Sequence, residues 1–262
     1  MNAYLPPLFY KNRSISHTVF MPAYYTHHLV ASKALDTLPA PTKNILDLYL
    51  PLYFFGAQGA DFCFLYRYLS PREKNFGSYL HRQGGYPAFC VLKSLASRDL
   101  PLLAYTLGYT THYAVDVTFH PFVYAHARKS IWSHARIESA MDAQFRQSIS
   151  LSDCHTKLLA QRLSTEEETL LFTAYSAIAV RCGFPPLQKP AFLRSIARFH
   201  HFPPFPNIPF GKQKIYPAKE AEGLFTQSVD FASELFDTLF TCIKKQTPPP
   251  QELFGKNYLT GL

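Results

Sequence analysis

The segment HYAVDVTFHPFVYAHARKSIWSHARIE, which runs from His112 to Glu138, repeats histidine and carboxylate residues at intervals of four. Residues four apart lie one turn apart on the same face of a helix, so His112, Asp116 and His120 would form one row of side chains. His134 and Glu138 would form a second row on the following helix. The segment therefore predicts two successive helices that present imidazole and carboxylate groups together.

Proline and serine residues indicate where these two helices begin and end. The first starts at Leu100, and Pro121 disfavours the helical backbone at the residue before it, so we expect this helix to end or kink at His120. Ser133 is of a residue type that caps helix N-termini, so we expect the second helix to run from there to about Gln147.

Two chemistries fit rows of this kind. A histidine and a carboxylate four residues apart often form a surface ion pair. Imidazole and carboxylate are also ligands that zinc accepts readily. Asp116 lies in the apolar run YAVDVTF, where an unpaired carboxylate would be costly, so we expect it to be ion-paired or bound to a metal. Local spacing by itself leaves both alternatives open.

Helical periodicity extends over most of the chain, and no stretch alternates convincingly as a strand does. Ser164 and Glu167 predict a capping box at the start of one helix, and Gly183 predicts its end. The sequence therefore predicts an all-α fold, a compact multi-helix bundle of about eight to ten helices. Further helices are expected within residues 27–38, 44–55, 77–97, 164–182 and 217–245.

The composition is that of a folded protein with a basic surface. Of the 262 residues 47% are hydrophobic and 17% charged, which excludes a disordered chain. The formal net charge of +8 favours anionic partners, namely phosphate esters, nucleic acid or the surface of an anionic membrane, without choosing among them. The five cysteines form no CxxC pair, which argues against a disulfide framework and a cysteine zinc module.

The N-terminal residues contain no uninterrupted apolar run of the kind found in signal peptides. No stretch approaches the roughly 18 apolar residues of a membrane-spanning helix. We therefore predict a cytoplasmic protein without a transmembrane segment, which can still touch a membrane from the inside. Residues 1–20 are predicted to be a poorly ordered extension, and residues 21–262 a single domain that starts with MPAYYTHH.

Three upstream motifs offer further candidate ligands. Asp61 ends the turn GAQGAD, where glycines let the backbone approach a ligand closely. His81 lies in GSYLHRQGG, and His27 and His28 lie in YYTHHLVA near the start of a helix. The alternative for each of them is an ordinary turn aspartate or a satisfied core histidine.

The order of these motifs resembles that of the bacterial zinc-dependent phospholipase C family. The resemblance covers Met21 to Glu138, whereas the C-terminal half matches only in being helical. It is specific for the metal site and less so for the substrate. The motifs are, in order, Thr-His, Gly-x-x-Gly-x-Asp, Leu-His, His-x-x-x-Asp-x-x-x-His-Pro and His-x-x-x-Glu.

This resemblance implies an all-α bundle around a cluster of three zinc ions. Asp61 and Asp116 would be catalytic, because Asp61 would orient or deprotonate the attacking water and Asp116 would bridge two ions. His27 is preferred over His28 because it follows Thr26 directly. The implied ligands are Asp61, His81, His112 and Asp116 for the first zinc, His120, His134 and Glu138 for the second, and His27 with Asp116 for the third. His126, His155, His200 and His201 match no family position.

The third site departs from the family pattern. Secreted members complete it with the amine and carbonyl of an N-terminal tryptophan, and the only tryptophan here is Trp132. We therefore expect two tightly bound zinc ions and a third with partial occupancy at most.

The resemblance implies a zinc-dependent phosphodiester hydrolase that uses an activated water on a phospholipid-type substrate. Zinc lowers the pKa of a coordinated water from 15.7 toward 7. Alternatives are a single-strand nuclease or a phosphatase on the same metal cluster, and a protein in which the metal serves stability alone. The basic charge suits nucleic acid, but no concentrated basic run is present.

Overall fold

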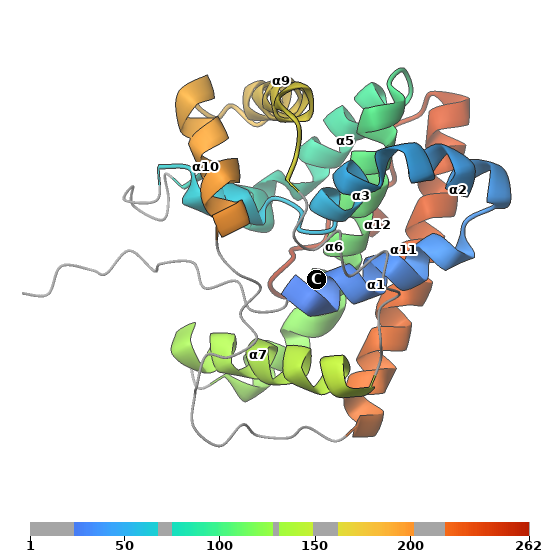
Figure 1. Ribbon diagram of the computed structural model, residues 1–262, viewed down its shortest axis with the longest axis vertical. Helices are drawn as coiled ribbons and strands as arrows, with labels where there is room; N and C mark the ends of the chain where they lie inside the picture. The colour runs from blue at the N-terminus through green and yellow to red at the C-terminus, as the bar shows by residue number, and fades with distance from the viewer. Residues whose placement is uncertain (1–23, 68–74, 128–130, 149–161, 202–217, 262) are drawn as a thin grey trace, which may run out of the picture.

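The computed structural model describes residues 24–67, 75–127, 131–148, 162–201 and 218–261, and helices are the only regular secondary structure there (Figure 1). This confirms the all-α prediction. The predicted extension 1–20 and His155 lie outside the described residues. The elements are α1 (Tyr24–Thr37), α2 (Ala40–Leu46), η1 (Asp47–Tyr49), α3 (Leu50–Gly56), η2 (Asp61–Leu65), α4 (Phe76–Tyr79), η4 (Leu80–Gly84), α5 (Gly85–Ala96), α6 (Leu100–His126), α7 (Ile131–Ser148), α9 (Thr165–Arg181), α10 (Lys189–His201), α11 (Ala218–Lys245) and α12 (Gln251–Phe254).

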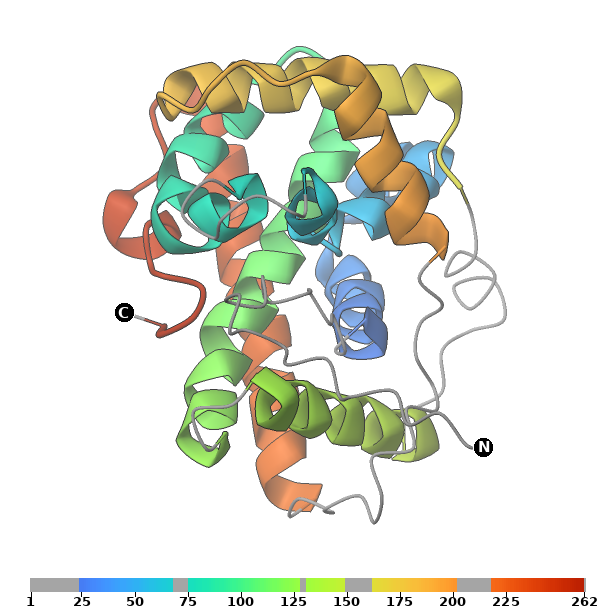
Figure 2. The same cartoon turned by 90° about the vertical axis from the view of Figure 1, so that its left-hand side faces the viewer.

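Helix α6 runs through the middle of the molecule, with α9 across one end and α7 at the other (Figure 2). Its first turn is capped by the Asp99 side chain, which accepts a hydrogen bond from the Leu102 N–H at 2.9 Å. From Ala104 to Val117 every residue is buried, so the helix is covered on all sides by its neighbours. The row from His112 to His120 therefore lies in the interior.

Glycines bring α3 into backbone contact with α6. A Cβ atom at Gly108 would lie 1.9 Å from the carbonyl oxygen of Tyr53, and one at Gly56 would lie 2.3 Å from that of Tyr105. Gly59 has a φ of +54°, which favours glycine, and a Cβ there would lie 2.0 Å from Cδ2 of the His112 ring. These contacts place the GAQGAD turn, and so Asp61, beside α6.

The helix was expected to end or kink at His120. It does not end there, because α6 continues through Pro121 to His126. A proline inside a helix removes the hydrogen bond to the carbonyl four residues earlier, here that of Val117. The C-terminal segment passes this carbonyl, since a Cβ at Gly261 would lie 2.8 Å from its oxygen. His120 thus stays in the helical row with His112.

Two further predictions concern helix starts. Ser133 is not a cap, because α7 already begins at Ile131 and Ser133 lies in its first turn. The capping box of Ser164 and Glu167 is confirmed, with both reciprocal hydrogen bonds present at the start of α9.

The expected helix over residues 77–97 is interrupted. Helix α4 leads into the π-helical turn η4, which carries His81, and α5 follows. Single π-helical turns often occur at functional sites.

Helices α1 and α6 contribute to two groups of buried apolar residues. Residues of α3, α5, α9 and α10 complete the larger group, and residues of α7 and the start of α11 complete the smaller one. None of the helices in the described ranges is both long and apolar enough to cross a membrane. The four described cysteines are free thiols, and Cys154 lies outside the described residues.

Candidate metal centre

All the predicted ligand residues lie together in the interior, at the point where α1, η2, η4, α6 and α7 meet. They belong to segments far apart in the sequence, and the fold alone brings them into contact. His27 comes from α1, Asp61 from the start of η2, His81 from η4, His112, Asp116 and His120 from α6, and His134 and Glu138 from α7.

Asp116 is the hub of this arrangement, with four imidazole rings around its carboxylate. Its Oδ2 lies 3.2 Å from Nε2 of His112 and 3.7 Å from Nε2 of His81. Its Oδ1 lies 3.5 Å from Nε2 of His27 and 3.8 Å from Nδ1 of His120. A carboxylate whose two oxygens face different sets of histidines has the placement that a bridging ligand needs.

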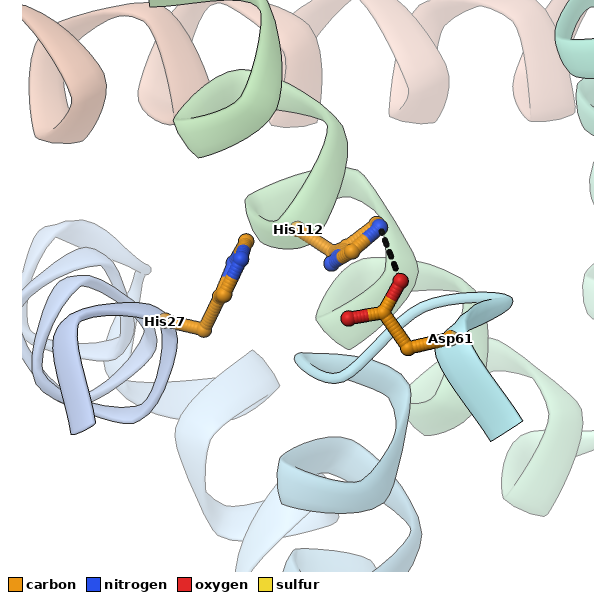
Figure 3. A group of neighbouring side chains, drawn as sticks. All are labelled: His27, Asp61 and His112. Carbon is orange, nitrogen blue, oxygen red and sulfur yellow. Dashed lines mark ion pairs between the residues drawn. The ribbon is translucent and has the colours of Figure 1, made fainter. Parts of the chain in front are cut away.

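Asp61 completes the first part of the centre. Its Oδ1 lies 3.0 Å from Nε2 of His81 and 3.9 Å from Nε2 of His112. Figure 3 shows Asp61, His27 and His112 converging from three separate elements. The Asp61 side chain is 15% exposed, compared with 6% for Asp116, so it is the carboxylate of this part that solvent reaches more readily.

The second part of the centre consists of His120, His134 and Glu138. Oε1 of Glu138 lies 2.8 Å from Nε2 of His134 and 3.4 Å from Nε2 of His120. The facing atoms of these three residues lie within 4.8 Å of one another, as do those of His81, His112 and Asp116. Each set is close enough to share one ion.

Unpaired polar atoms test whether these residues fit metal ions. Nε2 of His81, both ring nitrogens of His112 and Nδ1 of His27 are buried and make no hydrogen bond of good geometry, although carboxylate oxygens lie 3.0 and 3.2 Å from the two Nε2 atoms. Leaving buried polar atoms unpaired costs free energy, and a metal ion would satisfy those that face the cluster. Zinc accepts this set of imidazole and carboxylate ligands, so the residues fit zinc.

Backbone carbonyls orient two of the histidines. Nδ1–H of His81 donates to the carbonyl of Gly77, and Nδ1–H of His120 donates to the carbonyl of Tyr258, both at 2.8 Å. In the neutral ring each bond places the proton on Nδ1 and leaves the lone pair of Nε2 directed at the centre. Histidines that bind metals are commonly oriented in this way.

The pKa values show how strongly the charges in the centre interact. Burial would raise the pKa of Asp116, but the neighbouring His112 and His120 outweigh it, and the pKa falls well below its usual range. Burial opposes the shift at Glu138 too, where His134 and His120 bring the pKa to about 2. Both carboxylates are therefore ionised at neutral pH, as metal ligands must be.

The histidine pKa values respond to the same charges. Burial would lower the pKa of His120, but Asp116 and Glu138 raise it to about 9. At His27 burial and the nearby His112 lower the pKa to about 4, so this imidazole is neutral at pH 7.

The other histidines of the described residues stand apart from the centre. The His28 ring stacks on Phe54 at 4.1 Å, on a different side of α1 from His27. His126 and His201 bond to carbonyls of their own helices, and the His200 ring lies 5.3 Å from that of Phe55.

Asp142 supports the centre and was not among the predicted residues. It lies on α7 and accepts hydrogen bonds from the N–H groups of Tyr25 and Thr26, at 3.2 and 2.9 Å, and from the Thr26 hydroxyl. It thereby caps the start of α1 and holds His27 in place. Burial raises its pKa to about 6, against the opposing effect of Thr26. Its spacing of four from Glu138 was a signal that could have found it.

A small cavity lies beside Asp116, between α1, α6 and α7. Its volume is about 10 Å³, the room that a single water or ion needs. Its lining contains both polar and apolar residues. The polar lining is Thr26, His27, Asp116, His120 and Glu138, and the apolar lining is Val115, Phe119, Val123 and Met141.

Comparisons with known proteins bear on the family. Neither the search of curated proteins nor the search of solved structures gave a match. The family model described as zinc dependent phospholipase C matches residues 26–178, which is more than half of the 262-residue chain. The matched region contains all the predicted ligands. This chain belongs to the zinc dependent phospholipase C family.

Proposed function

We propose that this protein is a zinc-dependent hydrolase of phosphoric esters that acts on a phospholipid-type phosphodiester. The observation that carries the proposal is the group of buried histidines His27, His81 and His112, whose Nε2 atoms lie 3.2 to 3.7 Å from the ionised carboxylate of Asp116. The products would be diacylglycerol and a phosphorylated head group. Family membership supports this substrate class.

The proposed ligands fall into two parts that share α6. His81, His112, Asp61 and Asp116 would hold one zinc, and His120, His134 and Glu138 a second, while His27 with Asp116 offers a third position. Zinc, when bound, supplies a Lewis acid for the phosphoryl oxygens and makes a nearby water acidic enough to react at neutral pH.

The protein's own groups have separate roles in this proposal. Asp61 is the more exposed carboxylate of the first part, so it would orient the attacking water and take up its proton. Asp116 is buried and would keep a negative charge between the metal positions. The carbonyls of Gly77 and Tyr258 would hold His81 and His120 in the ligating tautomer.

The net charge of the whole chain is compatible with an anionic substrate. The formal net charge of +8 attracts phosphate esters and the surface of anionic membranes, and we propose peripheral contact with such a membrane. We also propose that residues 21–262 act as one domain.

The test combines metal analysis with a panel of substrates. Protein purified without added metal should contain zinc and hydrolyse short-chain phosphatidylcholine faster than bis-nitrophenyl phosphate or single-stranded DNA. A preference for DNA would identify a nuclease instead. Zinc-loaded protein that hydrolyses none of the three would contradict the proposal.

A matched pair of variants links activity to the centre. Asp61→Asn should lower turnover while zinc content stays near native, because one ligand oxygen is kept and the proton acceptor is lost. Asp47→Asn changes an exposed aspartate on η1 and should leave turnover unchanged.

A further inference from the structure

The C-terminal segment, Pro249 to Gly261, lies outside the region matched by the family model, yet it contacts both parts of the metal centre. We propose that Tyr258 is a positioning residue that fixes the positions of the His81 and His120 rings relative to each other for metal binding. The proposal rests on the proposed function only in requiring that the centre binds metal.

The first contact orients His120. The carbonyl oxygen of Tyr258 accepts the hydrogen bond from Nδ1–H of His120 at 2.8 Å, across 138 residues of sequence. Nε2 of the same ring lies 3.4 Å from Glu138. The position of the Tyr258 backbone therefore sets the direction in which His120 offers its lone pair.

The second contact fixes His81. The N–H of Tyr258 donates to the backbone carbonyl of His81 at 3.3 Å. The Tyr258 ring also packs edge-on against the His81 ring, with centroids 5.2 Å apart. Because His81 lies on the π-helical turn η4, this packing restrains a histidine whose helix is irregular.

The Tyr258 ring is itself held on several sides. It is fully buried, packs edge-on against Tyr113 at 4.9 Å, and its hydroxyl lies 2.9 Å from that of Tyr109. Gly85 leaves space for it, since a Cβ there would lie 2.6 Å from Cε1 of Tyr258. A side chain held so firmly can transmit its position to the backbone groups that touch the two histidines.

The rest of the segment is anchored by contacts that avoid the metal ligands. The fully buried Phe254 ring packs on Phe89 with centroids 4.8 Å apart. The Tyr113 hydroxyl donates to the carbonyl of Leu253 at 2.9 Å and accepts from the N–H of Lys256 at 3.0 Å. Anchoring of the segment and positioning of the histidines can thus be separated by substitution.

The experiment compares Tyr258→Leu with Phe254→Leu in the full chain. Both replace a fully buried aromatic residue of the same segment, but only Tyr258 touches the histidines. Zinc affinity is measured by competition with a chelator, metal geometry by the visible spectrum of the cobalt(II)-loaded protein, and stability by thermal unfolding.

Tyr258→Leu should weaken zinc binding by about 10- to 100-fold, the usual effect of losing a residue that orients a metal ligand, and should change the cobalt spectrum. Phe254→Leu should lower the unfolding temperature to a similar extent while affinity and spectrum stay native. Tyr258→Phe keeps the ring and the backbone contacts, so it should retain the native spectrum.

A second perturbation covers the case in which Tyr258→Leu does not fold. Gly85→Ala displaces the Tyr258 ring from outside the segment and should produce the same change in the cobalt spectrum. Native spectra in Tyr258→Leu or in Gly85→Ala, or an equal spectral change in Phe254→Leu, would overturn the proposal. Failure of the unsubstituted protein to bind metal would overturn it too, and would also contradict the proposed function. Metal binding without ester hydrolysis would contradict the proposed function alone.

Discussion

At the scale of single residues, the centre depends most on Asp116. Four imidazoles lie within 3.2 to 3.8 Å of its two oxygens, and they come from α1, η4 and α6. An ionised carboxylate buried in this way is stable only while positive charge faces it. In the metal-free protein a proton on His120 contributes that charge, because its pKa is raised to about 9, and metal ions would replace it.

Replacing Asp116 with Asn tests this dependence. The amide keeps the shape but removes the charge, so zinc affinity should fall at least about 10-fold and activity should fall with it. Elemental analysis and a phosphodiester assay measure both. Asp47→Asn, on the exposed surface of η1, is the control, and native zinc content in Asp116→Asn would contradict the expectation.

The stability of the metal-free protein should depend on pH through His120 and Glu138. The pKa of His120 is raised to about 9, so its contribution is complete below its ordinary pKa of 6.5 and is lost as the pH rises through 9. The pKa of Glu138 is lowered to about 2, so its contribution is present above 4.5 and is lost as the pH falls through 2. The two contributions are complete together only between pH 4.5 and 6.5.

Thermal unfolding of chelator-treated protein across this range is the measurement. The unfolding temperature should fall between pH 6.5 and 9, and His120→Asn should reduce that fall. An equal decrease in the native protein and in His120→Asn would show that other groups cause it.

At the scale of elements, two kinds of contact set the positions of the candidate ligands. Backbone contact at Gly56 and Gly108 brings α3 against α6 and so places the turn that ends in Asp61. The Asp142 side chain joins α7 to the first turn of α1 and so places His27. Gly56, Gly108 and Asp142 are not proposed metal ligands, so these contacts position the centre without belonging to it.

Gly108→Ala should force α3 and α6 apart, because the new Cβ would lie 1.9 Å from the Tyr53 oxygen. Overpacking of this kind costs about 1 to 3 kcal/mol of unfolding free energy. Gly223→Ala on α11 meets no atom within 4 Å and should stabilise the helix by up to about 1 kcal/mol. Denaturant unfolding compares the two, and equal stabilities would contradict the close contact.

Asp142→Ala should remove the cap of α1, at a cost of about 1 to 2 kcal/mol, and should also weaken zinc binding through His27. Asp99→Ala removes the comparable cap of α6, which lies away from the centre. Unfolding and zinc titration of both variants distinguish the effects. If the two variants bind zinc equally well, Asp142 serves stability alone.

At the scale of the whole molecule, the centre is assembled from more of the chain than the family match covers. The predicted ligands lie within residues 26–178, whereas the carbonyl that orients His120 belongs to Tyr258. The C-terminal segment therefore contributes to the site without supplying a ligand.

A chain that begins at Met21 should fold and bind zinc as well as the full chain does. The first described helix starts at Tyr24, and the family match starts at residue 26. Thermal unfolding and zinc content of the two chains are the measurements. A decrease in unfolding temperature of more than about 4 °C, which corresponds to roughly 1 kcal/mol or more, would show that residues 1–20 belong to the domain.

The sequence by itself determined the helical class, the two rows of histidine and carboxylate residues and the capping box of α9, because each depends on residues within one or two turns. The His112 row and the His134 row were visible as spacings of four on single helices. The order of motifs also indicated the family, because both the spacing within each motif and the order of the motifs can be read directly from the sequence.

Only the tertiary structure decided how these rows meet and what supports them. Pro121 indicated that α6 ends or kinks at His120. The helix instead continues to His126, because packing along it outweighs the loss of one hydrogen bond, and His120 stays on the same helix as His112. His27 and His28 are adjacent in sequence, and only the packing of α1 turns one toward Asp116 and the other onto Phe54. The contact between Tyr258 and His120 spans 138 residues, and no local pattern encodes a backbone carbonyl brought that far by the fold.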